Sequence, residues 1–254
     1  QMFELYPYKQ IIAIGSQAEY GFYHGPVDEN HVLRPSIEYA YAKKLCSEYL
    51  KKYCKSKGIE WQWIRIFTVF GEKQTGGLIK LVIDKCKSGD RVFDTTKGDQ
   101  QYSYLYAFDF AKALCLVLGA RGKSGIYNLS QPQEVHSNRY ILRCIKEKMH
   151  ADIQFNFGAI PYAGGQIMLM DGRVEKFENS FGPIPHTDFD FALNKRLNQI
   201  LFRLNQQVDH QLKLIYLINS NEYFHKLNRL NLLIYLSVSK VLEYVLLVHL
   251  NRKV

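Results

Sequence analysis

The chain has 254 residues, 47% of them hydrophobic, and a formal net charge of +9 at neutral pH. This composition is enough for one large hydrophobic core or two small ones. The five cysteines are odd in number, widely spaced and without a CxxC pair. This pattern excludes a disulfide framework and a zinc site, and it indicates reduced, mostly buried thiols. The eight histidines form no HExxH-type cluster, so no metal site is expected.

The positive charge is unevenly distributed along the chain. Nine basic and only three acidic residues follow position 193, so most of the excess charge lies in the C-terminal tail. A nucleic-acid partner would depend on this tail alone, and we therefore expect none. The first ten residues show no basic region followed by an apolar stretch, so no signal peptide is expected and a cytoplasmic protein is predicted.

Up to about residue 193, short apolar runs alternate with segments of helical periodicity. Alternation of strands and helices predicts an α/β protein with a largely parallel sheet. In chain order, we expect strands over residues 10–16, 61–70, 91–96, 100–106, 125–130 and 152–158, and helices over 37–57, 77–87, 109–118 and 137–149.

The composition changes at about residue 201. From there to the last residue the chain contains no Gly and no Pro, which predicts a tail of one or two helices. The segment Leu230–Leu250 is long enough to span a membrane, but it contains Lys240 and Glu243. Each charge at the centre of a membrane helix costs roughly 2.5–3.5 kcal/mol. We therefore expect a packed or interfacial helix, with membrane contact by the tail as the alternative.

Three segments carry polar or aromatic side chains to one edge of the predicted sheet. The first strand ends at Ser16, and the carboxyl edge of an α/β sheet is the usual ligand edge. Tyr39 and Lys43 follow four residues apart on the next helix, so they share a face. The strand "IRIFTVF" runs into a glycine turn and would bring Phe67 and Thr68 to the same edge.

This set of side chains suits proton transfer coupled to hydride transfer. A free phenol has a pKa near ~10 and is a poor base at neutral pH. A nearby ammonium group stabilises the phenolate, which makes general acid–base catalysis efficient. Ser16 could hold the reacting oxygen against Tyr39. A pair such as Tyr39 and Lys43 also occurs on exposed helices without a catalytic role, so the prediction depends on the combination of all three segments.

That combination, from Ile11 to about Leu193, resembles the extended short-chain dehydrogenase/reductase family, in its branch of NAD-dependent nucleotide-sugar epimerases, dehydratases and reductases. The resemblance implies that Tyr39 exchanges a proton with a sugar oxygen and that Ser16 hydrogen-bonds this oxygen. It implies that Lys43 binds the nicotinamide ribose, together with Tyr39, and tunes the tyrosine. Phe67 falls where the family packs an aromatic side chain near the nicotinamide. Thr68 falls where many members place an asparagine at the substrate.

Two motifs depart from the family pattern. The segment "GDQQYSYLYAFDFAKAL" resembles the family's Gly-x-Gln-x-Arg-Asp-Tyr motif, but Tyr102 stands in place of the arginine and Ser103 in place of the aspartate. Tyr102 is therefore the substrate-binding residue expected there. "PYAGGQIMLM" resembles a substrate-domain motif that often carries an arginine where this chain has Ala163.

The family's glycine-rich cofactor turn cannot be placed in this sequence. Gly119, Gly122 and Gly125 have the right spacing, but they follow a predicted helix and precede a predicted strand, the reverse of the required order. The resemblance thus predicts an N-terminally truncated family member with a partial Rossmann-type parallel sheet that lacks its first βαβ units. We expect the later part of the dinucleotide-binding domain over residues 1–120, a small α/β substrate domain over 121–200, and a helical tail over 201–254.

The resemblance implies NAD or NADP as cofactor, a nucleotide-sugar substrate and a homodimer in the intact family. It favours a 4-keto reductase or epimerase that acts at C4 of a (deoxy)hexose, as used for surface polysaccharides. A dehydratase is disfavoured because Gln17 and Ala18 replace the Asp-Glu pair typical of that branch. Without the glycine-rich turn, this chain alone is expected to be inactive. The alternative is a catalytically dead remnant, or a binding or scaffold module whose tail is an interaction helix.

Overall fold

The computed structural model describes residues 8–200 and Gln206. The chain divides into two units, Gln1–Arg196 and Leu197–Val254. The predicted helical tail over 201–254 lies outside the described residues, apart from Gln206. Within the described part, no helix has the length and apolar character that crossing a membrane requires.

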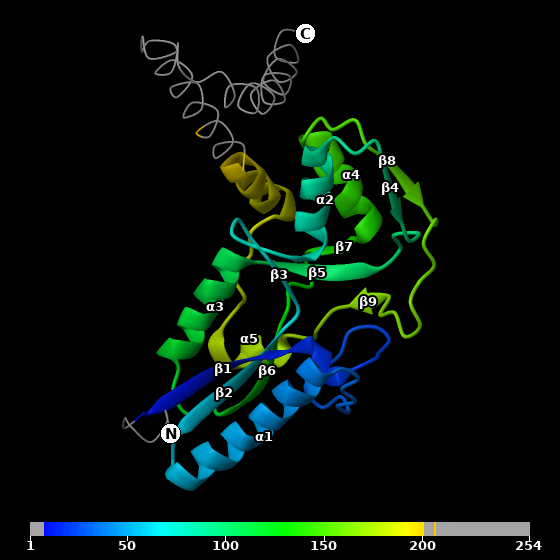
Figure 1. Ribbon diagram of the computed structural model, residues 1–254. Helices are drawn as coiled ribbons and strands as arrows, with labels where there is room; N and C mark the ends of the chain where they lie inside the picture. Colours follow the sequence, from blue (N-terminus) through cyan, green and yellow to red (C-terminus); the bar gives the residue numbers. More distant parts are fainter. Residues whose placement is uncertain (1–7, 201–205, 207–254) are drawn as a thin grey trace, which may run out of the picture. The chain divides into compact units, whose positions relative to one another are not determined.

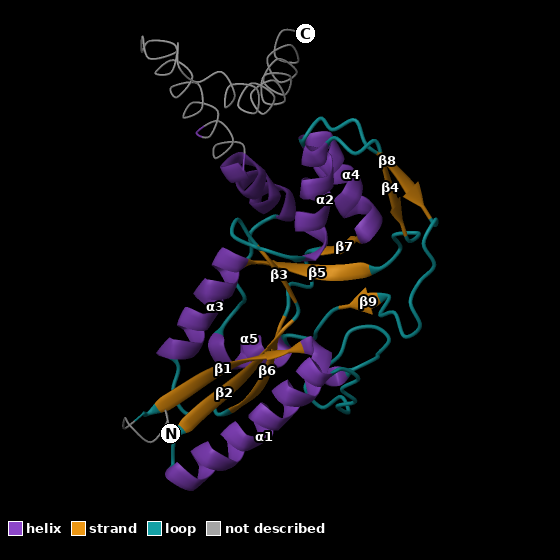
Figure 2. Cartoon of the chain, viewed as in Figure 1, coloured by secondary structure: helices purple, strands orange, loops and turns teal. Residues whose placement is uncertain are grey.

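A parallel sheet with strand order β1-β2-β6 forms the first layer (Figures 1 and 2). The register aligns Ser16 with Ile66, and Ile66 in turn with Leu129, so the carboxyl ends of all three strands meet at one edge. The strands are β1 (Gln10–Ser16), β2 (Glu60–Ile66) and β6 (Gly125–Leu129).

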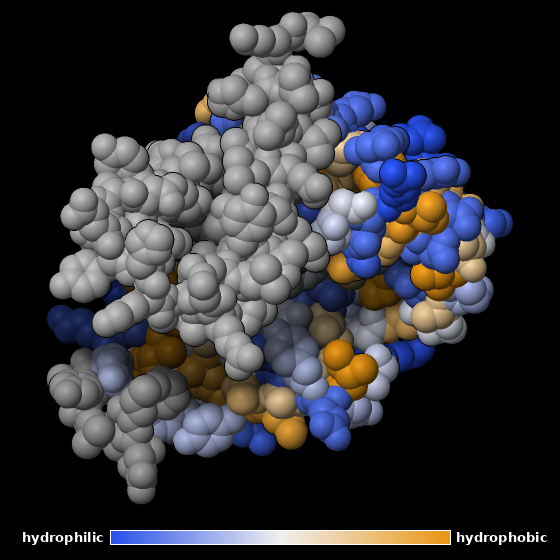
Figure 3. All heavy atoms as spheres, turned by 45° about the horizontal axis from the view of Figure 1, so that its top comes forward, coloured by the Kyte–Doolittle hydropathy of each residue, from blue (hydrophilic) through white to orange (hydrophobic). Residues whose placement is uncertain are grey.

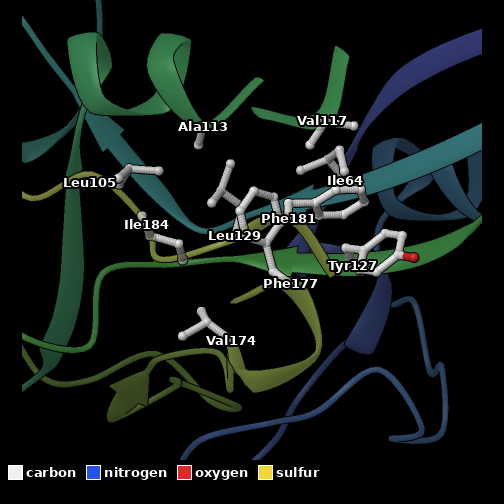
Figure 4. Close-up of a cluster of buried hydrophobic side chains, with 10 residues drawn as sticks. All are labelled: Ile64, Leu105, Ala113, Val117, Tyr127, Leu129, Val174, Phe177, Phe181 and Ile184. Carbon is white, nitrogen blue, oxygen red and sulfur yellow. The ribbon is translucent and has the colours of Figure 1, made fainter. Parts of the chain in front are cut away.

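Helices cover both faces of this sheet. On one face, Trp61 and Trp63 of β2 pack against Leu50 and Cys54 of the helix α1. Ile64 points to the opposite face because successive side chains of a strand alternate. Figure 4 shows the resulting core, in which side chains of β2 and β6 meet those of two helices. The helices are α1 (Glu38–Lys57) on the first face, and α3 (Ala107–Gly119) and α5 (Glu175–Phe181) on the second.

Smaller sheets form the remainder of the first unit. β3 pairs with β5, which also pairs with β7 and β9, and β4 pairs with β8. On the face seen in Figure 3, hydrophilic and hydrophobic residues lie interspersed over the described surface. These strands are β3 (Thr68–Phe70), β4 (Val92–Thr95), β5 (Gln101–Tyr106), β7 (Val135–Ser137), β8 (Gln154–Phe157) and β9 (Leu169–Met170), and the helices among them are η2 (Gln17–Tyr20), α2 (Gly77–Ser88) and α4 (Asn138–Lys148).

The α/β fold with a mainly parallel sheet is confirmed, and three details of the prediction are wrong. The single strand expected over 61–70 is divided at Phe67, because β2 pairs with β1 and β6 whereas β3 pairs with β5. The short elements β7, β9 and α5 were not predicted. The thiols are less buried than expected, since Cys54 and Cys144 are buried, Cys86 is half-buried, and Cys46 and Cys115 are exposed.

Candidate active site

Ser16 is fixed at the point where β1 passes into η2. Its Oγ accepts a hydrogen bond from the backbone N–H of Ala18 at 3.2 Å, and its own N–H donates to the carboxylate of Glu19 at 2.9 Å. The bond to Glu19 is one half of a reciprocal capping box, in which the Ser16 side chain also accepts from the backbone N–H of Glu19. Only 8% of Ser16 is exposed, so its hydroxyl has a defined place at the carboxyl edge of the sheet.

Tyr39 and Lys43 lie in the first two turns of α1, which packs against β1 and η2. The Nζ atom of Lys43 lies 5.8 Å from the centre of the Tyr39 ring. The same ammonium donates to the backbone carbonyl of Ile14 at 2.7 Å. Lys43 is thereby tied to β1 two residues before Ser16, whereas Tyr39 is 52% exposed.

Phe67 directly follows β2, at the same edge of the sheet. It is 7% exposed and packs in a cluster with Tyr20, Tyr23 and Val27. Gly172 lies so close to the ring that a Cβ there would be 2.4 Å from two of its carbons. The aromatic ring therefore has one place available to it.

Thr68 and Tyr102 meet around Met170. The hydroxyl of Thr68 lies 3.6 Å from the Met170 sulfur, and Tyr102 is paired with Met170 across β5 and β9. The Tyr102 hydroxyl accepts a hydrogen bond from Gln166 Nε2 at 3.0 Å. Burial raises the pKa of Tyr102 above its ordinary value, and the bond from Gln166 opposes this increase. Met170 also packs against the Phe67 cluster.

The predicted residues thus form two groups. In the first, Lys43 links the end of β1, where Ser16 lies, to the ring of Tyr39, and in the second, Phe67, Thr68 and Tyr102 lie around Met170. Among the described residues, no hydrogen bond joins Tyr102 to the first group.

A buried polar network behind Ser16 was not predicted. Glu19 and Arg65 are 0% and 1% exposed, and their side chains form an ion pair at 2.9 Å. Arg65 Nη1 donates to the Tyr20 hydroxyl at 3.1 Å, and this hydroxyl donates to Asn128 Oδ1 at 2.6 Å. A charged residue inside the apolar run "WIRIF" is the sequence signal that could have indicated it.

Among the described residues, no Gly-x-x-Gly-x-x-Gly turn leads from a strand into a helix. Gly119 ends α3 and Gly125 begins β6, so the glycine spacing falls between a helix and a strand, as predicted. Within the same described part, no group of three or more His, Cys, Asp or Glu side chains could hold a metal ion.

A parallel sheet with helices on both faces is the architecture of the doubly wound α/β folds. The model of the NAD dependent epimerase/dehydratase family matches residues 2–130, which is half of the chain. The chain therefore belongs to this NAD-dependent family.

Individual relatives agree with this assignment. The chain is 33% identical over 117 residues to a protein of Methanocaldococcus jannaschii whose name assigns it to the UDP-glucose 4-epimerases, and the match covers 44% of this chain and 38% of the relative. The chain thus spans well under half of that relative's length.

Solved structures share the fold. UDP-N-acetylglucosamine 4-epimerase from Methanobrevibacter ruminantium, in complex with UDP-N-acetylmuramic acid, matches with a TM-score of 0.69 at 23% identity over 77% of this chain and 64% of that chain. UDP-glucose 4-epimerase from Thermotoga maritima, with UDP-glucose, gives a TM-score of 0.66 at 18% identity over 76% and 64%. RMD from Pseudomonas aeruginosa, complexed with NADPH, gives 0.67 at 16% identity over 74% and 65%.

Proposed function

We propose that these residues form the substrate half of a nucleotide-sugar epimerase or 4-keto reductase that acts at C4 of a hexose or deoxyhexose. The observation that supports the proposal is the position of the Lys43 ammonium, which is bonded to the Ile14 carbonyl of β1, two residues before Ser16, and lies 5.8 Å from the centre of the Tyr39 ring. The names of the relatives, which include UDP-glucose 4-epimerases, support C4 as the reacting carbon.

In this proposal the dinucleotide, when bound, accepts or supplies a hydride, and the side chains of this chain manage the proton. The Tyr39 phenolate takes the proton of the C4 hydroxyl when the sugar is oxidised, and the neutral Tyr39 hydroxyl gives a proton to the C4 keto oxygen when it is reduced. The Lys43 ammonium, 5.8 Å from the ring centre, supplies a positive charge beside the anionic form of Tyr39 that takes the proton. The Ser16 hydroxyl donates to the same sugar oxygen and keeps it within reach of Tyr39.

The neighbourhood of Ser16 supports epimerisation or reduction over dehydration. Gln17 follows Ser16 directly, and its Oε1 accepts a hydrogen bond from the Tyr23 hydroxyl at 3.0 Å. Tyr23 is 2% exposed, and burial raises its pKa well above the ordinary value. An amide held by a neutral phenol cannot act as the acid or base that an elimination of water needs at this position.

The test adds the part of the fold that would bind the pyrophosphate of the cofactor. A fusion would place, before these 254 residues, the first strand, glycine-rich turn and helix units of a family member, and UDP-glucose with NAD would be the first assay mixture. Conversion to UDP-galactose is expected, and Tyr39→Phe should remove nearly all turnover with an unchanged melting temperature because only a hydroxyl is lost. Ser16→Ala should cost less, since it removes an orienting hydrogen bond. If Tyr39→Phe kept wild-type turnover, the proposed role of Tyr39 would be wrong. A folded fusion inactive on a panel of UDP-, GDP- and dTDP-sugars would favour the scaffold alternative.

A further inference from the structure

The proposed chemistry uses neither member of the buried Glu19–Arg65 ion pair. Both side chains are fully buried, and Arg65 Nε lies 2.9 Å from Glu19 Oε2. Taking two opposite charges out of water is costly, and the structure keeps such a pair only where further hydrogen bonds satisfy its remaining atoms. The contacts of the pair therefore indicate what it holds in place.

The other oxygen of Glu19 joins two elements. Glu19 Oε1 accepts from the backbone N–H of Ser16 and from the indole Nε1 of Trp63, both at 2.9 Å. Ser16 ends β1, whereas Trp63 and Arg65 lie on β2. One carboxylate thus fixes the Ser16 backbone to the neighbouring strand.

The space around this carboxylate is filled. A Cβ at Gly15 would lie 2.2 Å from Trp63 Nε1 and 2.7 Å from Glu19 Oε1. Arg65 is held from its far side by Tyr20, whose ring centre is 4.7 Å from the guanidinium carbon. Glu19 therefore has little freedom to move. Its hydrogen bond from the Ser16 N–H restricts the movement of Ser16 as well.

We propose that Glu19 is a positioning residue for Ser16 and that Arg65 holds Glu19 in the geometry this requires. The inference rests on the proposed function, because it assigns Ser16 the bond to the sugar oxygen. Lys43 is tied to the carbonyl of Ile14 on the same strand end, so fixing Ser16 also sets its distance from Lys43 and Tyr39. The ion pair then sets the geometry of proton transfer from behind the site.

The first experiment observes the free 254-residue chain by ¹⁵N–¹H NMR. In Glu19→Gln, the Trp63 indole signal should move while that of Trp61 stays, and Ser16 amide exchange should accelerate by about tenfold or more, as expected for a lost bond to a charged acceptor. Glu134→Gln is the matched control, since Glu134 is also buried and bonds His136 and His186 instead. It should leave the Ser16 and Trp63 signals unchanged.

The second experiment uses the active fusion and a double-mutant cycle. Glu19→Gln should lower kcat by about tenfold with little change in KM, and adding it to Ser16→Ala should cause almost no further loss, because both act through one hydroxyl. Glu134 has only a structural role, so Glu134→Gln should change kcat by the same factor in the wild-type and Ser16→Ala proteins. If Glu19→Gln fails to fold, Glu19→Gln with Arg65→Met removes the unpaired buried charge and replaces it in both experiments.

The outcomes separate the two proposals. The positioning role would be overturned if Glu19→Gln lowered kcat by the same factor with and without Ser16→Ala. An unchanged exchange rate of the Ser16 amide in folded Glu19→Gln would also overturn it. In both cases the proposed function would stand. An inactive fusion would count against the proposed function, and the NMR comparison would still decide whether Glu19 fixes Ser16.

Discussion

Replacing Gly172 with alanine should destabilise the protein, because the new methyl group would enter space that the Phe67 ring already fills. The added Cβ would lie 2.4 Å from Cε2 and from Cζ of this ring. Non-bonded carbons keep about 3.5–4.0 Å, so the ring or the backbone must move by about 1 Å. Phe67 is 7% exposed and packed against Tyr20 and Tyr23, which leaves it little space. Overpacking of this kind costs about 1–3 kcal/mol, and we expect ~2 kcal/mol.

Urea unfolding followed by tryptophan fluorescence measures this change in the free energy of unfolding. Gly119→Ala is the matched control, because a Cβ added at Gly119 would have nothing within 4 Å and Gly119 belongs to α3. That variant should be neutral or more stable by up to ~1 kcal/mol. Phe67→Leu in the Gly172→Ala background should recover part of the loss. A Gly172→Ala protein within ~0.5 kcal/mol of wild type would refute the reasoning, since surface substitutions alone reach that range.

Two further predictions follow from the pKa values of buried groups. Burial and the neighbouring carboxylate of Asp190 raise the pKa of the Cys144 thiol to about 12, so iodoacetamide at pH 8 should label the exposed Cys46 and Cys115 well before Cys144, as peptide mass spectrometry would detect; equal labelling of a folded sample would be inconsistent with this. Burial also raises the pKa of Asp171, so the folded chain keeps the Asp171 proton to a higher pH than the unfolded chain does. The stability that this proton contributes is complete below the unfolded pKa and is lost as the pH rises through the folded pKa. Unfolding titrations at about pH 4 and pH 7 should therefore show Asp171→Asn gaining on wild type as pH rises, and a constant difference would contradict it.

The elements that could be predicted are those whose periodicity is local. The first strand is predicted with its observed bounds, and α1 begins one residue later than expected. The division at Phe67 could not be predicted, because residues 61–70 are apolar enough for one strand. What ends β2 is a tertiary choice, since Thr68 pairs with Tyr104 on a strand that follows much later in the chain.

The residues of the site likewise fall into those that could be predicted from the sequence and those that could not. Tyr39 and Lys43 could be found from their spacing, because residues four apart on a helix are neighbours whatever the rest of the chain does. Glu19 and Arg65 are 46 residues apart in sequence, and only the pairing of β1 with β2 brings them together. The arginine inside an apolar strand signals that a partner exists, but it does not identify the partner.

The cofactor prediction depends on which contacts these 254 residues hold. Affinity for a dinucleotide in this fold comes largely from a first βαβ unit, whose glycines let the backbone approach the pyrophosphate and whose helix N-terminus supplies N–H donors. Among the described residues, no Gly-x-x-Gly-x-x-Gly turn leads from a strand into a helix, and Gly119 and Gly125 instead link a helix to a strand. The family resemblance gives Tyr39 and Lys43 contacts to the nicotinamide ribose alone. Each charge-assisted bond to the pyrophosphate is worth roughly 1.5–3 kcal/mol, so losing a few would move a micromolar site beyond the millimolar range. We therefore expect a polypeptide of these 254 residues to show no saturable NAD(H) or NADP(H) binding below millimolar concentration and no turnover, whereas the fusion should bind. Titration calorimetry or NADH fluorescence on both proteins would test this, and a micromolar dissociation constant for the shorter one would mean that the pyrophosphate is held by residues other than a glycine-rich turn.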